Sequence, residues 1–168
     1  MIKKIDKLTL VKLIIAQLTD KLAQAEKAAN DAHAAAVDDE SVAETQYDTL
    51  AIEASYLAEG QSKRVLEFKQ AINAYEELIL RDFDESTQIA LTALVQLSAD
   101  IEARHWFFIA PAAGGFRCQL KCQNDTVNIT VITPSSPMAL ALLGKYQEDD
   151  IEIILGNSKL DDYIANIC

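Results

Sequence analysis

The fold is decided by residues 8–36, LTLVKLIIAQLTDKLAQAEKAANDAHAAA, and residues 47–79, YDTLAIEASYLAEGQSKRVLEFKQAINAYEELI. In both segments, mostly apolar residues recur three or four apart, the a/d spacing by which a helix buries one narrow seam. The spacing therefore predicts two long helices. The first seam contains Leu8, Val11, Ile15, Leu18, Leu22, Ala25, Ala29, Ala32 and Ala36. The second contains Tyr47, Leu50, Ala54, Leu57, Gln61, Val65, Phe68, Ile72, Tyr75 and Ile79.

The two seams match in size when the chain reverses its direction at residues 41–42. In that register Ala25 faces Leu57 and Ala36 faces Tyr47, so that small residues meet large ones. Residues 41–44, SVAE, have the form of a capping box, which satisfies free amides at the start of a helix. We therefore expect an antiparallel coiled-coil hairpin over residues 1–80, with its turn near residues 38–44.

Charge is distributed unevenly along this hairpin. Residues 38–59 hold seven acids and no base, whereas residues 1–37 hold six lysines and four acids. Carboxylate oxygens bind hard cations such as Mg²⁺, and a second cation in a nucleotidyl-transfer site activates water. A solvated turn, or acids that favour a helix N-terminus, would explain the same residues structurally. The acids at the tip are Asp38, Asp39, Glu40 and Glu44.

The remainder of the chain changes to a β-rich pattern after the charged link at residues 81–85. Strands are predicted near residues 89–97, 106–110, 116–122, 127–132, 151–155 and 163–167. A short apolar helix over residues 138–143 is ended by Gly144. The class is α+β: residues 86–168 should form a small antiparallel sheet domain with one short helix.

Composition excludes several classes of function. A net charge of −11 over 168 residues is unfavourable for a free nucleic-acid-binding protein, which needs clustered Lys and Arg. Three cysteines, with no disulfide framework, suit a reducing compartment. Cys118 and Cys122 lack the second pair that a metal site requires. No apolar stretch is long enough to span a membrane. These features predict a cytoplasmic protein. Separately, we expect a monomer.

No nucleophile and base form a motif in this sequence. His33 and His105 are isolated, and the glycines form no phosphate-binding loop. The protein is therefore not expected to be an independent enzyme or to hold a cofactor of its own.

Residues 132–145, ITPSSPMALALLGK, and residues 149–153, DDIEI, resemble the C-terminal domain of the GreA/GreB transcription elongation factors. The shared form is Ser-Pro, a short helix, Leu-x-Gly-Lys, and an Asp that opens a strand. Residues 56–61, YLAEGQ, with Arg64, are similar to the second coiled-coil helix of the same family. Together with the hairpin, the resemblance covers essentially the whole chain.

The resemblance implies an FKBP-like C-terminal domain that binds RNA polymerase and a coiled coil that enters the secondary channel. Contact with RNA would occur only inside the polymerase complex, and any DNA binding would be indirect. The tip acids would act in trans, with Asp39 and Glu44 sharing a Mg²⁺ ion with the polymerase and provoking cleavage of backtracked RNA. The residues that it implies for polymerase binding are Ser136, Pro137, Leu143, Gly144 and Lys145.

The tip departs from the family pattern. The usual GDLSENAEY is replaced by residues 37–47, VDDESVAETQY, so that Asp39 and Ser41 align but Val42 stands where the second acid is expected. Glu40 or Glu44 would have to substitute. A Gre-like inhibitor without cleavage activity is therefore one alternative.

Two further alternatives belong to other classes of protein. An FKBP-like prolyl isomerase or chaperone would use Trp106, Phe107, Phe108 and Phe116 in an apolar pocket. Three of these aromatics are consecutive, however, and would alternate between the two faces of a strand. A plain interaction module would dimerise through its hairpin.

Overall fold

The computed structural model describes residues 5–40, 49–122 and 125–168. By compactness the chain divides into two units, one of Met1–Ile14 with Ala74–Cys168 and one of Ile15–Asn73. The division falls inside both long helices. We call the first the sheet unit and the second the hairpin unit.

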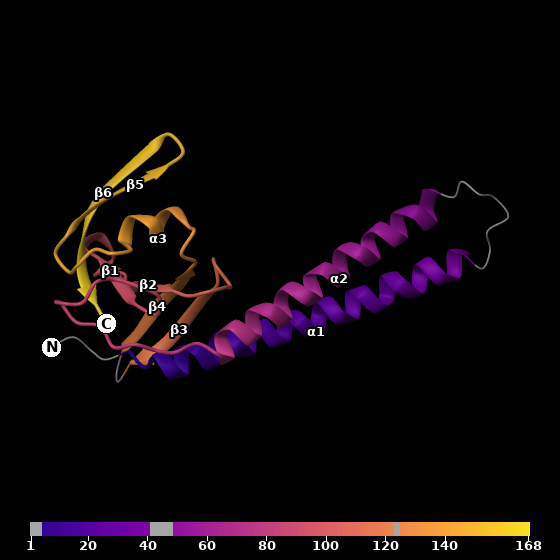
Figure 1. The fold of residues 1–168 in the computed structure, drawn as a ribbon, viewed down its shortest axis with the longest axis horizontal. Coiled ribbons are helices and arrows are strands. Elements are labelled where there is room, and N and C mark those ends of the chain that lie inside the picture. Colours follow the sequence, from indigo (N-terminus) through magenta and orange to yellow (C-terminus); the bar gives the residue numbers. More distant parts are fainter. Residues whose placement is uncertain (1–4, 41–48, 123–124) are drawn as a thin grey trace. The chain divides into compact units, whose positions relative to one another are not determined.

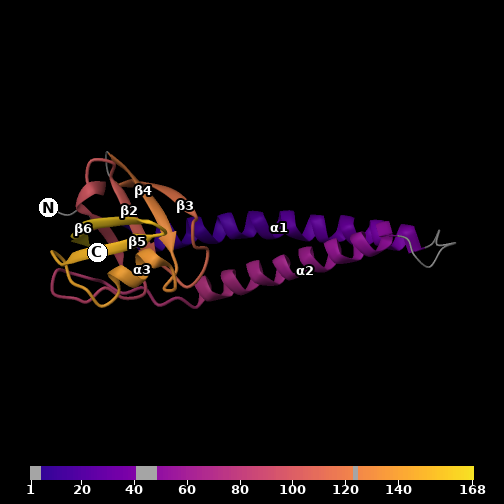
Figure 2. The same cartoon turned by 90° about the horizontal axis from the view of Figure 1, so that it is seen from above.

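The two predicted helices are confirmed as α1 (Lys7–Glu40) and α2 (Thr49–Glu76), which run side by side (Figure 1, Figure 2). The first seam is buried at Leu18, Ala25, Ala32 and Ala36. The second is half-buried at Gln61, Val65, Phe68 and Ile72. Among the described residues no helix is both long and apolar enough to cross a membrane.

The buried residues differ from the predicted seams near the start of α1 and at two positions of the second seam. Leu10 and Ile14 are fully buried, whereas the expected Leu8 is 55% exposed and Ile15 is half-buried. The first turns of α1 belong to the sheet unit. Their buried face therefore packs on a broader surface than a single partner helix would offer. In the second seam, Leu57 and Ile79 are exposed, contrary to expectation.

The expected register between the helices was wrong by several residues. Glu26 pairs with Lys69 at 3.0 Å, and Ala28 lines a hollow with Gln61, whereas reversal at residues 41–42 would place Ala25 opposite Leu57. The described helices end at Glu40 and resume at Thr49, so the midpoint of their connection lies between residues 44 and 45. The capping box at residues 41–44 lies outside the described residues.

The second predicted part is also confirmed, as a sheet with one short helix. Its helix α3 spans Pro137–Leu142, and a 3-10 turn, η1, spans Ser98–Asp100. The six strands stand in the order β3-β4-β2-β1-β6-β5. They are β1 (Leu94–Leu97), β2 (His105–Ile109), β3 (Arg117–Cys122), β4 (Asp125–Ile132), β5 (Asp150–Leu155) and β6 (Ser158–Ile167).

One pairing in the sheet differs from the expected antiparallel arrangement. β4 pairs antiparallel with β3 but parallel with β2, in the register of Phe107 with Thr130. The sheet is therefore mixed. An alternating strand pattern identifies which face is buried but not which strand becomes the neighbour, so the sequence could not reveal this pairing.

The sheet buries side chains on both of its faces. Val95 belongs to a hydrophobic core cluster that includes Ala139 and Leu142 of α3, and Phe107 packs against this cluster. Phe108, which follows Phe107 in β2, points to the opposite face and is also fully buried. Burial on both faces explains why β1 reads as a continuous apolar run apart from one glutamine. The sheet is thus a packed platform that fixes α3 and its flanking loops.

Candidate functional site

The segment from Thr133 to Asp150 forms a capped helix between two strands. The Ser136 hydroxyl accepts a hydrogen bond from the Ala139 amide at 3.2 Å, and Pro137 occupies the first turn, where its missing N–H has no cost. The sequence predicted a helix start at residue 138, without these two contacts. The cap and the proline fix the point at which the chain leaves β4 and enters α3.

Gly144 ends this helix for a conformational reason. Its φ is +78°, a left-handed value that favours glycine, and nothing lies within 4 Å of the place where a Cβ would sit. The Gly144 amide donates to Ile89 O at 2.9 Å, and the Ile89 amide donates to Lys145 O at 2.8 Å. This reciprocal pair ties the end of α3 to the chain that precedes β1.

The five residues implied for partner binding divide into two groups. Ser136 and Gly144 shape the backbone, and half-buried Leu143 packs against the core of the sheet unit. Pro137 is exposed, and Lys145 is half-buried. Only the last two are therefore suited to direct contact.

An exposed leucine of α3 was missed by the sequence interpretation. Leu140 is 66% exposed, whereas its neighbours Ala139 and Leu142 are fully buried. Helical spacing within residues 137–142 could have separated this outward position from the buried ones. Pro137, Leu140 and Lys145 together make the candidate contact surface of the sheet unit.

The tip acids are placed only in part. Asp38, Asp39 and Glu40 are the last three residues of α1, whereas Glu44 lies outside the described residues, as do the side chains of the other three. The helix thus continues through three residues that were expected to form the turn. Among the described residues, no three side chains of His, Cys, Asp or Glu lie close enough together to hold a metal ion. The predicted Mg²⁺ ligands Asp39 and Glu44 remain a prediction.

The position of these acids in α1 bears on one structural explanation of them. Acids are favourable at the N-terminus of a helix, whereas these three residues end one. No basic residue occupies the last turn of α1. The structural explanation that acids favour a helix N-terminus therefore does not apply to Asp38, Asp39 and Glu40.

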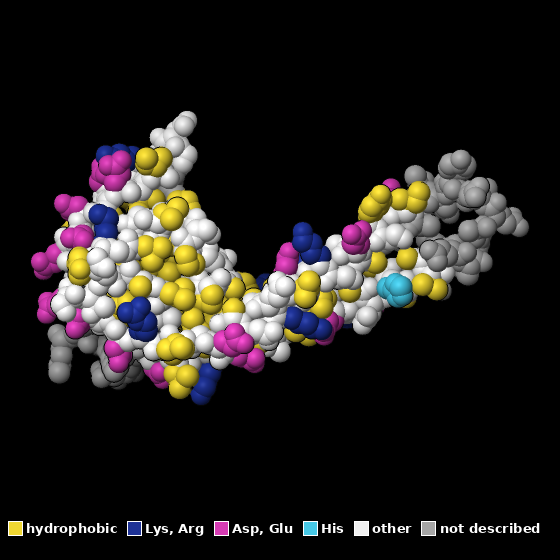
Figure 3. Space-filling model, in the orientation of Figure 1, with side chains coloured by type: hydrophobic (Ala, Val, Ile, Leu, Met, Phe, Trp, Pro, Cys, Tyr) yellow, Lys and Arg dark blue, Asp and Glu magenta, His cyan; other side chains and the backbone are white. Residues whose placement is uncertain are grey.

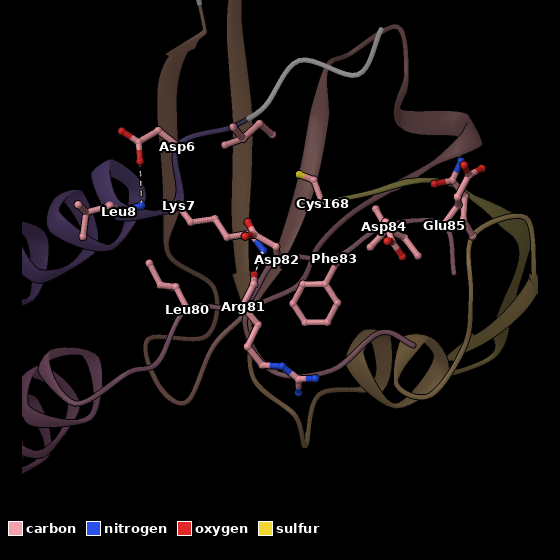
Figure 4. Close-up of a pocket in the computed structure, with 13 residues that line it drawn as sticks. Asp6, Lys7, Leu8, Leu80, Arg81, Asp82, Phe83, Asp84, Glu85 and Cys168 are labelled. Atoms are coloured by element: carbon pink, nitrogen blue, oxygen red, sulfur yellow. Dashed lines mark hydrogen bonds between the residues drawn. The ribbon is translucent and has the colours of Figure 1, made fainter. Parts of the chain in front are cut away.

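A hollow of about 670 Å³ that the sequence did not suggest lies beside the first turn of α1 (Figure 4). The Lys7 amine donates to Arg81 O at 2.6 Å and lies 4.6 Å from the centre of the Phe83 ring. The Arg81 guanidinium lies 5.5 Å from the same ring. Two cations on one aromatic ring stabilise the link at residues 81–85, which had been interpreted only as a domain boundary.

Capping and burial determine the titration of groups around this hollow. The hydroxyl and amide of Thr9 donate to Asp6 and lower the pKa of its carboxyl. Asp6 thereby caps α1, since the Leu8 amide also donates to it at 3.0 Å. Burial raises the pKa of the Cys168 thiol. The hollow is thus lined by a capped helix start and by a buried thiol.

The two histidines lie in different environments. His105 Nε2 lies 2.8 Å from the Thr130 hydroxyl, and its Nδ1 lies 3.3 Å from the Asp100 carboxylate. The ring also contacts Phe107 edge to face, with centroids 4.6 Å apart. His105 thus links η1, β2 and β4, while His33 is exposed on α1.

The aromatic residues of the isomerase alternative do not converge. Trp106 and Phe108 are 6% and 0% exposed on one face of β2, and Phe107 packs into the cluster on the other face. Their apolar area is used in the core, which argues against a shared peptide-binding pocket.

The sequence matches no family model and no curated protein. Among solved structures it is similar to the transcription factor Gfh1, with 15% identity, coverage of 91% of this chain and 92% of that chain, and a TM-score of 0.36. For the GreA factor homolog 1 (Gfh1) of Thermus thermophilus these values are 16%, 92%, 94% and 0.34. For Gfh1 of Thermus aquaticus they are 18%, 90%, 92% and 0.33. Values this low do not assign the chain to a family.

Proposed function

We propose that this protein regulates transcription elongation by binding RNA polymerase and inserting its helical hairpin into the secondary channel. The observation that carries the proposal is the folded form of residues 132–150. Ser136 caps α3, Gly144 ends it at a positive φ, and Asp150 begins β5, as the resemblance to GreA/GreB requires. The chain would act on the polymerase active site and not as an independent enzyme.

The proposed action depends on the acids near the end of α1. Asp38, Asp39 and Glu40 are the last three residues of α1, so a preference of acids for a helix N-terminus does not account for them. An all-oxygen donor set fits Mg²⁺, and Asp39 with Glu44 would hold the ion together with groups of the polymerase. The ion would supply an activated water for cleavage of backtracked RNA.

The proposed anchor is the contact surface of Pro137, Leu140 and Lys145. An exposed leucine between a proline and a lysine offers apolar area with a polar rim. Lys145→Glu and Leu140→Asp should each weaken polymerase binding without unfolding the protein, because both positions lie on the surface. Ser136 and Gly144 are unsuitable for this test, since their substitution would disturb the backbone itself.

The decisive experiment measures RNA cleavage by backtracked polymerase complexes with and without the protein. Asp39→Ala with Glu44→Ala should abolish stimulation and leave polymerase binding intact. Glu53→Ala with Glu67→Ala removes the same charge elsewhere on the hairpin and should change neither property. Stimulation by the tip variant equal to that of the parent would show that these acids are not the ones used.

A Gre-like inhibitor is the second candidate, and it is favoured by Val42 at the position where the second acid is expected. Such a protein would bind the same channel and slow RNA extension without promoting cleavage. Measuring extension and cleavage on the same stalled complexes separates the two functions. Loss of inhibition in the Lys145→Glu variant would tie either effect to binding through the sheet unit.

A further inference from the structure

The hairpin unit has a second stripe of side chains on the face of α2 turned away from the buried seam. Ile52 and Gln70 are 18 residues apart, about five full helical turns, and so project in the same direction. Gln61 of the buried seam is nine residues from each and projects in the opposite direction. The stripe consists of Ile52, Tyr56, Glu59, Lys63, Leu66 and Gln70.

This stripe exposes large apolar side chains at coiled-coil spacing. Ile52, Tyr56 and Leu66 are 52%, 71% and 55% exposed, and Glu59, Lys63 and Gln70 are exposed between and beyond them. Figure 3 shows hydrophobic side chains among charges of both signs on the exposed surface of α2. Single exposed apolar residues are common, but a row with alternating four- and three-residue steps is typical of a face that packs on another helix.

A glycine allows close approach at the middle of the stripe. Nothing lies within 4 Å of the place where a Cβ of Gly60 would sit, and Gly60 helps to form a shallow hollow between Tyr56 and Lys63. A glycine inside a helix costs about 1 kcal/mol relative to alanine. The backbone of a second helix could therefore approach here.

The order of residues indicates which helix would fit. The steps along the stripe are four, three, four, three and four, so the stripe has the same spacing in both directions. When a second copy of α2 lies antiparallel, Tyr56 meets Leu66 and Glu59 meets Lys63, and the same pairs form again by symmetry. A parallel arrangement in register would place like charges together at both central positions.

We propose that the exposed stripe of α2 is a self-association surface that binds α2 of a second copy of this chain in antiparallel orientation. Two reciprocal Glu59–Lys63 pairs at its centre select the orientation, and Tyr56 with Leu66 supplies the apolar contact. The stripe is about 27 Å long, which suits a weak, concentration-dependent dimer with a dissociation constant on the order of tens of micromolar. This inference departs from the expected monomer and does not depend on the proposed function.

Sedimentation velocity of the full chain at low salt, over micromolar to millimolar concentrations, tests the proposal directly. The parent should show a reversible monomer–dimer equilibrium that weakens with added salt, because the central contacts are ionic. Glu59→Lys and Lys63→Glu should each weaken association at least about tenfold, since like charges then meet at the centre. A parent that stays monomeric throughout this range would refute the proposal.

Charge exchange provides the specific arm of the test. An equimolar mixture of Glu59→Lys and Lys63→Glu proteins should recover dimers, and the double variant carrying both changes should dimerise like the parent. A parallel dimer in register would instead bring like charges together in the parent, in both single variants and in the double variant, so that neither single variant would be weaker than the parent. Single variants that associate like the parent, or a double variant that does not recover, would therefore overturn the antiparallel arrangement.

Two control variants separate this surface from general charge effects. Arg64→Glu and Glu53→Lys make the same changes of charge on other sides of α2 and should leave the dimer unchanged. Helical content measured by circular dichroism verifies that each variant is folded. Equal weakening by the controls, or unchanged dimerisation in Glu59→Lys, would assign association to another surface or to another partner and would reject the stripe.

Discussion

The sheet unit and the hairpin unit bury their side chains to different extents. In the sheet unit, both faces of the sheet are covered and residues such as Phe108, Val131 and Leu142 are fully buried. In the hairpin unit, the second seam is only half-buried, and several seam positions of the first are alanines. The two helices of the hairpin unit thus meet along a narrow contact that buries little apolar area per residue. The sheet unit, in contrast, contains a fully buried hydrophobic core.

The largest effect should separate two matched phenylalanine substitutions. Phe108→Ala in the sheet unit should lower the free energy of unfolding by about 3–5 kcal/mol, because it empties a fully buried site. Phe68→Ala in the half-buried seam should cost about 1–2 kcal/mol. Chemical denaturation of both variants measures the difference. Equal losses would show that the hairpin is packed as tightly as the sheet.

The next effect should change sign between the two units. Gly144→Ala forces alanine into a positive φ and should destabilise the protein by about 1–2 kcal/mol. Gly60→Ala, inside α2 with open space around it, should instead stabilise it by about 0.5–1 kcal/mol. Thermal unfolding of the two variants gives both signs in one experiment. Destabilisation by Gly60→Ala would contradict the open space found at this position.

A smaller, pH-dependent effect should occur in the sheet unit at Asp162. Burial opposes the change, but hydrogen bonds from the Ser98 hydroxyl and from the amides of Tyr163 and Ala99 lower the pKa of this carboxyl below 3.8. Because the folded pKa is the lower one, its contribution to stability is present above about pH 4 and is lost as pH falls through the folded pKa.

Asp162→Asn should therefore reduce stability at neutral pH and flatten its decline in acid, as measured by denaturation at several pH values. Asp150→Asn, at an exposed carboxylate nearby, provides the matched control. An unchanged acid profile in the Asp162 variant would contradict the assignment.

The smallest effect should be equal in the two units. The Glu26–Lys69 pair of the hairpin unit and the Glu152–Lys159 pair of the sheet unit both measure 3.0 Å, and their side chains are about half exposed. Double-mutant cycles with alanine should give a coupling of about 0.2–0.5 kcal/mol for Glu26–Lys69 and a similarly weak one for Glu152–Lys159. A much stronger hairpin pair would indicate that charge sets the register of α1 against α2.

Much of the local structure could be predicted because it depends on neighbours in the sequence. The Ser136 cap and the Gly144 stop follow from a hydroxyl before proline and from the freedom of glycine. The buried positions Leu18 to Ala36 follow from helical periodicity. Helical spacing also separates exposed Leu140 from buried Ala139 and Leu142, but residues 138–143 were interpreted only as one short apolar helix.

For the candidate sites, the sequence predicted which residues are present but not where the fold places them. The sequence located the acids Asp38, Asp39 and Glu40 and assigned them to the turn, whereas they are the last three residues of α1. It also gave no sign that Lys7 would meet Arg81 and the Phe83 ring, because those contacts join segments more than 70 residues apart.

The sequence by itself determined where helices and strands form, because periodicity, caps and turn residues act within a few positions of each other. Only the tertiary structure decided that β4 lies between β3 and β2, that Leu10 and Ile14 are buried at the start of α1, and how α1 pairs with α2. These features depend on which distant surfaces meet, and that choice is made by the packing of the whole chain.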